Sequence, residues 1–396
     1  MEYDVVVVGS GPAGAMASKT VAKTGLSTIL IEEHAAVGVP VHCGEGLPED
    51  GIKEVGLELD PRCIAARIKG ATLFSPNGEE IPFQTGEMFG YVVDRRVFDK
   101  CLANDAARAG ADIMMRTRAV GVIVENGFVK GVKVASEGKT FDIKARVVIA
   151  ADGIKSTVAR WAGLDTLTNL KNTNTCYQYE MAGVELEYPD RLGLYFKNEM
   201  APGGYAWVFP KGNDVANVGM GVRAGSEKSP KEYLDQFVKE QKCLRKAKIV
   251  EERAGAIPVG GPIKKMVTNG LITVGTAAHM VNPMTGGGMS LAMLTGVMAG
   301  EIVSQSVKDG DTSAERLAEY EEKVEKVCGK KLRANLRFRQ AFDKMSDEDL
   351  NHFLRLFPEI YEVFHPLKKV SLKEKFSYVV KNAPTLAKFF KVYLTP

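Results

Sequence analysis

Two short runs of consecutive apolar residues near the N-terminus flank a segment with helical periodicity. Residues 5–8 form a continuous β-branched run, and residues 28–31 form a second apolar run. Between them, residues 15–23 favour a helix, with Ala17 and Val21 recurring at helical spacing. Continuous apolar runs are typical of strands that are covered on both faces, as in parallel sheets. The pattern therefore predicts an α/β fold that opens with a Rossmann-like strand, helix and strand.

Alternating apolar and polar positions predict strands of a different kind further along the chain. Residues 119–149 alternate and turn at Asn126-Gly127 and Glu137-Gly138, which predicts an antiparallel meander. Residues 71–83 predict a hairpin with Asn77-Gly78 at its turn, and residues 175–223 predict several further short strands. We therefore expect an antiparallel β-sheet region, α+β in character, inserted into the α/β unit.

Helical periodicity returns after residue 310. Leu317, Tyr320, Val324 and Val327 are expected on one face of a helix, and Ser346 with Asp349 reads as a capping box that starts the next helix. The chain then divides into three parts. These are a nucleotide-binding domain at 1–60, 90–170 and 255–310, a β-sheet domain at 61–89 and 171–254, and a C-terminal helical region at 311–396.

The last thirty-odd residues combine basic and aromatic side chains. Seven lysines face a single acid, Glu374, and five aromatic residues interleave with them. Such a segment suits the surface of an anionic membrane, where each lysine contributes about 1 kcal/mol near the headgroups. An ordinary amphipathic helix packed on the body, with solvated lysines, fits the pattern equally well, and the two arrangements are compatible.

Composition and charge bear on the class of protein. Lys+Arg 52 nearly balance Asp+Glu 49, which does not indicate nucleic acid binding. Six scattered cysteines with no CxxC pair are typical of a reducing, cytosolic setting, without a disulfide framework or a metal site. No apolar run reaches the roughly 20 residues that span a bilayer, and no signal peptide is visible before the first strand. We expect a cytoplasmic protein, peripheral on the cytoplasmic face of the membrane.

A glycine motif follows the first apolar run. Gly9, Gly11 and Gly14 give the pattern GxGxxG, and the second strand ends in Glu32. The first glycine allows a tight turn, the second lets a pyrophosphate approach the backbone, and the third lets the helix lie close to the strand. Glu32 is placed to accept hydrogen bonds from ribose hydroxyls, whereas Glu33 is expected to face solvent. The motif predicts a dinucleotide site but does not distinguish NAD from FAD.

Two later stretches end apolar strands in glycine-containing loops. "ARVVIAADG" ends in Asp152-Gly153, and "GLITVGTAAHMVNPMTGGGM" carries three glycines, at 286–288, before a small-residue helix. Glycines before a helix leave unpaired N–H groups for an anion or a carbonyl. With all three stretches read together, the chain resembles the FAD-dependent oxidoreductases of the p-hydroxybenzoate hydroxylase type.

That resemblance implies FAD, with its ADP half at the first motif and its ribityl chain and flavin at the last. The arginine that lies near the cofactor in this family corresponds best to Arg95, with Arg96 a close second. The last motif usually has Gly-Asp where this chain has Gly275-Thr276, so a hydroxyl without charge would make that contact. The residues that the resemblance implies for FAD are Gly9, Gly11, Pro12, Ala13, Gly14, Glu32, Cys43, Gly44, Gly46, Arg95, Ala119, Asp152, Gly275, Thr276, Gly286, Gly287, Gly288 and Met289.

Two further motifs narrow the resemblance. "PGGYAWVFPKG" contains PxxYxWxFP, and "VPVHCGEGL" contains PxxCGxG. Together they resemble the geranylgeranyl reductases, and the archaeal lipid branch more than the chlorophyll branch. The resemblance implies that reduced flavin saturates isolated C=C bonds in geranylgeranyl chains on a glycerol phosphate or phospholipid. Electrons would come from NAD(P)H or reduced ferredoxin. Tyr205, Trp207 and Phe209 would line the substrate site in the β-sheet domain, although sheet packing also explains these aromatic residues.

Such a reduction needs a proton for the second carbon, and two residues are candidates for its source. His279 lies in the motif that the resemblance assigns to the flavin, and Cys43 lies in the loop expected to pass the flavin. A lone histidine is more often structural than catalytic, and His42 ranks below His279. Cys43 also fits a small neighbour of the flavin that shapes its pocket, which is the role we favour. No other Cys or His stands at zinc spacing, so no metal is expected.

Three other functions remain as alternatives. A flavin-dependent aromatic monooxygenase would use NAD(P)H and O2, and the two narrowing motifs weigh against it. A disulfide reductase needs paired cysteines, whereas Cys43 is solitary. A flavin-containing lipid-binding protein without turnover is separated from an enzyme only by activity.

Overall fold

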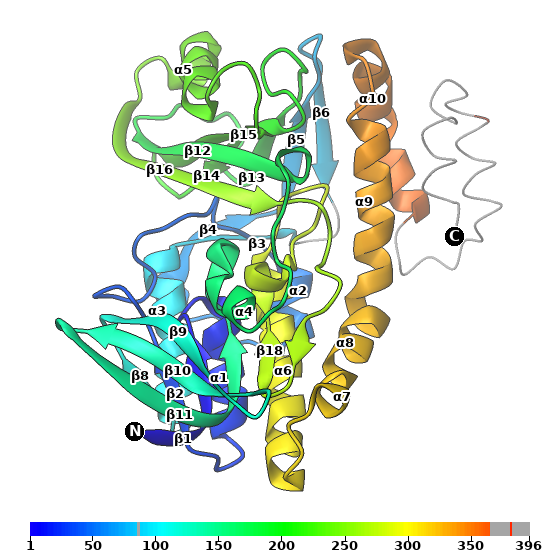
Figure 1. Cartoon of the computed structure of the whole chain (residues 1–396). Helices are drawn as coiled ribbons and strands as arrows, with labels where there is room; N and C mark the ends of the chain where they lie inside the picture. The colour runs from blue at the N-terminus through cyan, green and yellow to red at the C-terminus, as the bar shows by residue number, and fades with distance from the viewer. Residues whose placement is uncertain (85–87, 365–380, 382–396) are drawn as a thin grey trace.

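The computed structural model describes residues 1–84, 88–364 and 381. Nearly all of the basic segment at 365–396 lies outside these residues, and so do the predictions made for it. Figure 1 shows a lower unit built on an eight-stranded sheet, an upper unit built on a seven-stranded sheet, and a column of helices along one side of both.

Parallel strands form the central part of the lower sheet, in the order β18-β11-β1-β2-β8, with the antiparallel β17 beside β18. The strand, helix and strand predicted at the N-terminus are confirmed, and side chains 5–8 are almost fully buried. The elements are β1 (Glu2–Val8), α1 (Pro12–Ala22), β2 (Thr28–Ile31), β8 (Asp112–Met114), β11 (Lys139–Ala150), β17 (Val267–Thr268) and β18 (Leu271–Thr273).

The predicted meander is confirmed as β9 (Thr117–Glu125), β10 (Phe128–Ser136) and β11. Both turn pairs, Asn126-Gly127 and Glu137-Gly138, have positive φ angles. This is the backbone that two-residue hairpin turns require. The meander therefore joins the parallel sheet through β11, which pairs with β1 on its other side.

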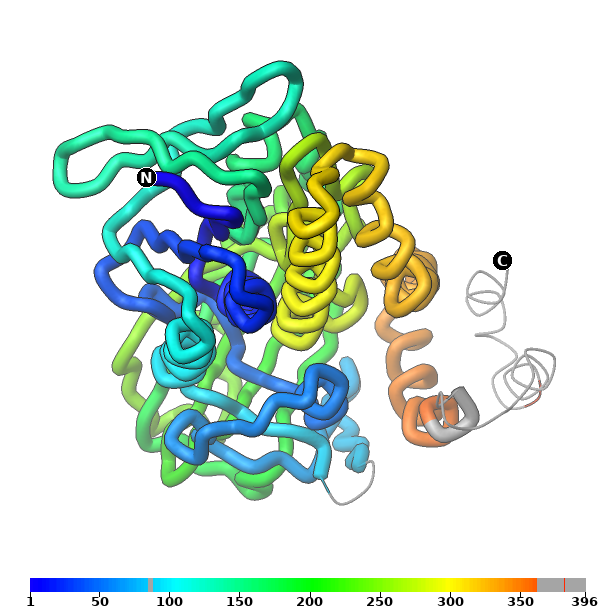
Figure 2. The backbone as a smooth tube through the Cα atoms, turned by 90° about the horizontal axis from the view of Figure 1, so that it is seen from below, coloured from blue at the N-terminus to red at the C-terminus, as the bar shows by residue number. Residues whose placement is uncertain are grey.

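Three long helices run beside one another in the lower unit, as Figure 2 shows from below. They are α1, α3 (Arg95–Arg108) and α6 (Met289–Asp309). A Cβ on Gly296 of α6 would lie 2.3 Å from the carbonyl oxygen of Ala13, so only glycine lets α6 pack this closely on α1. Smaller elements connect these layers: β3 (Gly46–Pro48), α2 (Glu49–Glu54), η1 (Pro61–Cys63), β4 (Ile64–Ile68), β7 (Gly90–Val93), η2 (Gly153–Lys155), α4 (Thr157–Trp161) and η5 (Gly275–Ala278).

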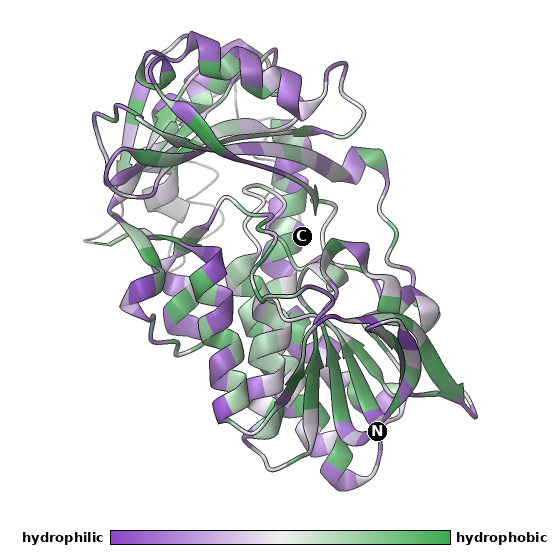
Figure 3. Ribbon diagram, turned by 90° about the vertical axis from the view of Figure 1, so that its left-hand side faces the viewer, coloured by the Kyte–Doolittle hydropathy of each residue, from purple (hydrophilic) through white to green (hydrophobic). Residues whose placement is uncertain are grey.

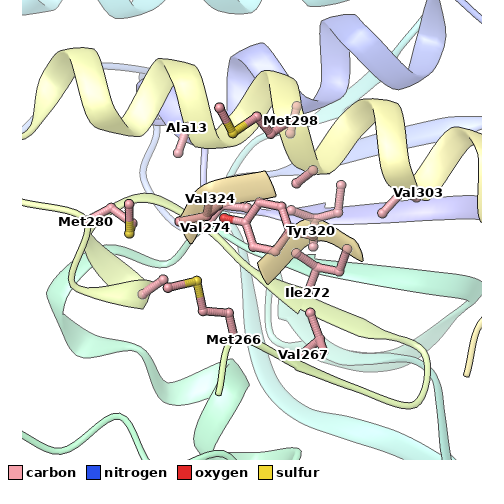
Figure 4. Close-up of a cluster of buried hydrophobic side chains, with 14 of the residues drawn as sticks. Ala13, Met266, Val267, Ile272, Val274, Met280, Met298, Val303, Tyr320 and Val324 are labelled. Carbon is pink, nitrogen blue, oxygen red and sulfur yellow. The ribbon is translucent and has the colours of Figure 1, made fainter. Parts of the chain in front are cut away.

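The core of the lower unit is continuous with the helical column. Tyr320 of the column is fully buried among side chains from β18 and α6, including Ile272 and Met298 (Figure 4). In Figure 3 the strands of the lower sheet are hydrophobic along most of their length, as the apolar runs predict.

The upper sheet has the order β16-β12-β15-β14-β13-β5-β6. The hairpin predicted at 71–83 is confirmed as β5 and β6, with Gly78 at a positive φ in its turn. Helix α5 packs on the outer face through Tyr233, Leu234 and Phe237. The elements are β5 (Gly70–Phe74), β6 (Glu80–Gln84), η3 (Leu170–Asn172), β12 (Thr173–Ala182), β13 (Arg191–Tyr195), β14 (Tyr205–Pro210), β15 (Val215–Arg223), α5 (Pro230–Glu240), η4 (Lys242–Leu244) and β16 (Lys248–Pro258).

The helical column contains α7 (Ala314–Leu317), α8 (Glu319–Val324), a π-helical turn at Glu325–Gly329, α9 (Lys330–Phe342) and α10 (Asp347–Phe364). The capping box of Ser346 and Asp349 is confirmed by reciprocal hydrogen bonds. The prediction that Val327 shares the buried face of Val324 is wrong: Val327 is 45% exposed. The π-helical turn adds a residue to the register, and Cys328 takes the buried position instead. No helix among the described residues is long and apolar enough to cross a membrane.

Candidate functional site

The GxGxxG glycines occupy three different environments. Gly9 has a φ of +102°, and a Cβ there would lie 2.5 Å from the carbonyl oxygen of Ala151. A Cβ on Gly14 would lie 1.9 Å from the carbonyl oxygen of Gly9, so these two glycines are needed for packing within the protein. At Gly11, by contrast, no heavy atom of the described residues other than its chain neighbours lies within 4 Å of the Cβ position. That open side is where a ligand can approach the backbone.

Helix α1, after Gly11, and helix α6, after Gly288, both begin without a side-chain cap and without an acidic residue in their first turns. Their first N–H groups and the positive ends of their dipoles are thus available to an anion or a carbonyl. Thr276 lies close to the start of α6, with its Oγ1 4.0 Å from the Cβ position of Gly288. The predicted ribityl contact of Thr276 is compatible with this position and stays a prediction.

Glu32 is buried at the end of β2 and is held by two neighbours. One carboxylate oxygen accepts from the backbone N–H and the hydroxyl of Ser10, at 3.0 and 2.7 Å, and the other accepts from the backbone N–H of His34. Burial opposes ionisation, but the hydrogen bonds from Ser10 and then His34 lower the pKa of Glu32 below its ordinary value. Glu33 instead pairs with Lys155, in accord with the expected outward direction. Ala119 lies in β9, two residues after Thr117, whose N–H donates to the carbonyl of Glu32.

Asp152 has one satisfied and one unsatisfied carboxylate oxygen. Its Oδ2 accepts from the backbone N–H groups of Thr157 and Val158, at 2.5 and 3.0 Å. Its Oδ1 is buried and has no hydrogen-bond partner among the described residues, and burial raises the pKa of Asp152. A buried, unsatisfied oxygen is costly unless a ligand supplies the donor. Together with the open side of Gly11 and the two uncapped helices, these residues fit a bound dinucleotide.

A pocket of about 70 Å³ lies between the upper sheet, the loop before α6 and helix α9. The hydroxyl of Tyr205 crosses this boundary and donates to the carbonyl of Thr285 at 2.5 Å. Burial raises the pKa values of both Tyr205 and Cys176, the latter to about 12, so both line the pocket in their neutral forms. Its lining includes Cys176, Phe196, Tyr205, Trp207, Ile257, Met284, Gly286 and Phe342, together with the charged residues Lys197, Arg339 and Asp343.

The segment from Cys43 to Gly46 packs against the inner face of the upper sheet. A Cβ on Gly44 or on Gly46 would lie 3.3 Å from the ring of Phe209, so both glycines admit that ring. The Cys43 carbonyl accepts from the Gln178 amide at 3.1 Å, and the Trp207 indole donates to the same amide at 2.9 Å. Phe209 therefore packs on this segment, while Tyr205 and Trp207 line the pocket. Contact of Gly44 and Gly46 with a flavin stays a prediction.

The thiol of Cys43 lies beside a buried ion pair. The guanidinium of Arg95 donates two hydrogen bonds to Asp99, both at 2.7 Å. Burial alone would lower the pKa of Arg95, but Asp99 and then the neighbouring Cys43 raise it above its ordinary value. Cys43 and His279 are outside the set of residues that line the pocket. Cys43 is thus a neighbour of Arg95, and neither residue lines the pocket.

Comparison with known proteins gives the family. A model described as geranylgeranyl reductase catalytic domain matches residues 172–257, and one described as pyridine nucleotide-disulphide oxidoreductase matches residues 3–190. A third, described as lycopene cyclase protein, matches residues 226–386. The digeranylgeranylglycerophospholipid reductase of Methanosarcina acetivorans is 40% identical over 96% of this chain and 98% of its own length. That of Methanocaldococcus jannaschii is 42% identical over 98% and 97%. The chain belongs to the geranylgeranyl reductase family.

Solved structures agree with this assignment. A geranylgeranyl bacteriochlorophyll reductase-like protein from Thermoplasma acidophilum has a TM-score of 0.89 and 33% identity, over 99% of both chains. A flavin-dependent brominase has a TM-score of 0.70 at 19% identity, over 100% of this chain and 94% of its own, which shows a shared fold. This geranylgeranyl reductase is an FAD-dependent oxidoreductase, and the residues around Gly11, Asp152 and the start of α6 fit that cofactor.

In this geranylgeranyl reductase, His279 is held in a structural contact. It has a φ of +56° and is 5% exposed, in the neighbourhood of the Thr166 backbone. Burial lowers the pKa of His279, and the Thr166 backbone offsets this only in part. The imidazole is therefore neutral near pH 7. His42 is exposed, and its Nδ1 lies 2.7 Å from the carbonyl of Ala254.

A buried charge network joins the two units, and sequence reasoning missed it. Glu45 is 0% exposed, and its carboxylate accepts from Lys211 at 2.8 Å, Arg253 at 3.1 Å and Asn217 at 2.6 Å. Its second oxygen accepts from the backbone N–H of Arg95 at 2.9 Å. Burial would raise the pKa of Glu45, but Lys211 and the other donors outweigh it and lower the pKa.

The network continues along the upper sheet with alternating charges. Glu180 accepts from Lys211 at 2.8 Å and from Arg253 at 2.7 Å, and Glu251 pairs with Arg253 and Arg96. The network thus pairs the three carboxylates described above with three cationic side chains. A sequence signal for it exists in β12, where Tyr177, Tyr179 and Met181 alternate with Gln178 and Glu180. Alternate residues of a strand face opposite sides of the sheet, so the polar residues of β12 lie on the face away from the apolar core. Where that face is also buried, its polar side chains need hydrogen-bond or ion-pair partners.

Proposed function

We propose that this enzyme uses reduced FAD to saturate isolated C=C bonds in the geranylgeranyl chains of 2,3-di-O-geranylgeranylglyceryl phosphate or phospholipid, as part of archaeal-type ether lipid synthesis. The observation that carries the proposal is the pocket between the aromatic strand β14 and the loop that starts α6. One wall belongs to the sheet matched by the reductase family, and another belongs to the loop that leads into the uncapped helix α6. Both curated relatives described above act, by their names, on digeranylgeranylglycerophospholipids.

FAD, when bound, supplies the hydride that one alkene carbon accepts. The residues of this chain position the alkene and exclude water, because an isolated alkene offers no polar group for an electrophilic contact. Trp207, Ile257 and Met284 give the pocket an apolar wall for an isoprenoid chain. Lys197 and Arg339 also line the pocket, and we propose that the polar part of the substrate lies beside them.

The second alkene carbon needs a proton, and Cys43 fits this role better than His279. The His279 ring is buried, and burial lowers its pKa, so it is a poor source of a proton. The Cys43 thiol lies beside the Arg95 guanidinium, a cation that balances the charge left on sulfur when a proton leaves. Trp207, which lines the pocket, is linked to the backbone carbonyl of Cys43 through the Gln178 amide. We therefore propose that the Cys43 thiol supplies the proton to the alkene.

We infer a peripheral position on the cytoplasmic face of the membrane, because the chains of the proposed substrate lie in that membrane. We infer NAD(P)H or reduced ferredoxin as the electron donor. No described helix is long and apolar enough to cross a bilayer, which is in keeping with contact at the surface.

One anaerobic experiment tests the reaction. The purified holoenzyme is reduced with dithionite and mixed with a geranylgeranyl glycerol ether lipid. The flavin spectrum should return to the oxidised form while the lipid gains hydrogen pairs by mass spectrometry. Reduced flavin that persists with an unchanged lipid mass contradicts the proposal. Oxygen-dependent NADPH consumption with an aromatic substrate would instead identify a monooxygenase.

The role of Cys43 is tested by Cys43→Ala and Cys43→Ser in the same assay. Both variants should keep FAD, and both should reoxidise their flavin with the lipid about 100-fold more slowly, because a general acid contributes roughly 10²–10⁴-fold. The variant Cys243→Ser, at a half-buried cysteine that does not line the pocket, serves as the control for thiol loss elsewhere. Full rates of lipid reduction in both Cys43 variants would show that the thiol only shapes the pocket.

A further inference from the structure

The two most exposed large apolar side chains among the described residues stand three positions apart in one loop. Leu167 is 74% exposed and Leu170 is 65% exposed, in the connection between α4 and β12. The loop itself is well anchored, because Thr166 is buried and Asn169 caps the 3-10 turn that contains Leu170. A fixed loop that holds two leucines in solvent is unusual for a soluble surface and marks a contact with an apolar phase.

This loop borders the mouth of the pocket. Arg223 donates to the carbonyl of Lys171 at 2.7 Å and pairs at 2.7 Å with Asp343, which lines the pocket. The backbone N–H of Val259, another lining residue, donates to the carbonyl of Asn172 at 2.8 Å. In Figure 1 the connection from α4 to β12 runs up the front of the molecule. The loop that carries the two leucines is therefore joined to the lining of the pocket through Arg223 and Val259.

Exposed lysines lie in and beside the same loop. Lys171 follows Leu170 directly, and Lys264 and Lys265 are exposed in the loop that touches both Asn172 and α9. The stretch 326–342, which contains all of α9, has six basic and no acidic residues. Protruding leucines with basic neighbours are the composition of surfaces that bind anionic lipid headgroups and insert apolar side chains between them.

We propose that Leu167, Leu170, Lys171, Lys264 and Lys265 form a docking rim that seats the pocket mouth on an anionic membrane surface. The inference rests on the proposed function, since the substrate chains lie in that membrane. With the rim seated, the substrate passes from the bilayer into the pocket while its chains stay out of water. Charge complementarity and continuity with the pocket favour a lipid surface over a second copy of this chain, because two copies would bring the same basic groups together.

Vesicle co-sedimentation of the FAD-loaded full chain tests the rim. Wild type should bind phosphatidylcholine vesicles that contain phosphatidylglycerol and bind pure phosphatidylcholine vesicles more weakly. The variant L167S/L170S should bind about tenfold more weakly or worse, because two apolar insertions are lost. The matched control V120S/V124S removes two exposed apolar side chains from β9, 38% and 55% exposed, and should bind like wild type. K264E/K265E should weaken binding mainly at low salt.

Activity separates this inference from the proposed function. With lipid substrate in anionic vesicles, L167S/L170S should lose about tenfold in kcat/KM, in line with its loss of binding. With the same lipid dispersed in detergent, L167S/L170S and wild type should reduce it equally. Equal vesicle binding by L167S/L170S and wild type overturns the rim, even if lipid reduction is normal. A wild-type dimer that L167S/L170S dissociates, seen by size exclusion with light scattering, also overturns it and assigns the leucines to a second copy.

Discussion

The two sides of the site are built on different physical interactions. On the lower side, backbone atoms pack closely against each other. Gly9 and Gly14 let α1 lie so near the sheet that a methyl group on either would collide with the backbone. Gly11 leaves open space beside its Cα for the cofactor. On the upper side, the contacts are buried ion pairs. Glu45, from the loop that carries Cys43, pairs with Lys211 and Arg253 of the upper unit. Steric fit of the backbone therefore determines the structure of the lower side, and buried ion pairs determine that of the upper side.

This difference has a mechanical consequence. Close backbone packing tolerates no larger side chain, but its contribution to stability does not depend on pH. A buried carboxylate, in contrast, contributes to stability only while it is charged and paired. Glu45 also fixes the start of α3 through the backbone N–H of Arg95. Its network therefore holds the upper sheet, the Cys43 loop and α3 in one arrangement. Variants on each side should separate the two kinds of interaction.

The largest effect is expected from Glu45→Ala. The substitution leaves Lys211 and Arg253 buried without one of their partners, which costs about 3–5 kcal/mol in unfolding free energy. Urea unfolding followed by flavin and tryptophan fluorescence measures it. The control Glu79→Ala removes an exposed partner of Arg355 and should cost about 1 kcal/mol or less. Equal losses for the two variants would show that the buried network contributes no more than a surface pair.

The lower side was predictable because its signals are local. GxGxxG, the second strand and Glu32 lie within thirty-two residues, and each glycine has a steric reason that repeats wherever this turn occurs. The pairing of Glu45 with Arg253 spans 208 positions and carries no motif. Val327 was misplaced for a related reason, since a single π-helical turn shifts the helical register without any composition signal.

The second prediction contrasts Gly14→Ala with Gly11→Ala. A methyl group on Gly14 collides with the carbonyl oxygen of Gly9, and overpacking of this kind costs about 3 kcal/mol. The methyl group on Gly11 meets open space, so the apoprotein should unfold at the wild-type temperature while FAD binding weakens. Thermal unfolding of both apoproteins, with FAD titration, makes the comparison. If the Gly11→Ala apoprotein unfolds at a lower temperature than wild type, other protein atoms occupy the space beside Gly11 in solution.

A smaller effect is expected from acid. The pKa of Glu45 in the folded protein lies below its ordinary value of 4.5, so its contribution is complete above that pH and is lost as the pH falls through the folded pKa. The pKa of Glu251 is lowered to about 2, chiefly by Arg253 against the opposing effect of burial, so it acts in the same direction. The difference in unfolding free energy between wild type and Glu45→Gln should be constant from pH 7 to about 5 and shrink below pH 4.5. A difference that stays constant to pH 3.5 would show that the charge on Glu45 contributes nothing.

The smallest effect is expected where the two sides meet at Tyr205. Tyr205→Phe removes the hydrogen bond to the Thr285 carbonyl, which is worth about 1 kcal/mol, and keeps the ring in the pocket wall. Thr285 precedes the glycines before α6 and lines the pocket. Loss of its hydrogen bond to Tyr205 should therefore make this part of the pocket lining more mobile, with little effect on the stability of the fold. We expect an unchanged melting temperature within about 3 °C and a several-fold higher KM for the lipid with a similar kcat. A drop in kcat at constant KM would instead place the Tyr205 hydroxyl in the proton path, and the sheet side would then contribute chemistry as well as position.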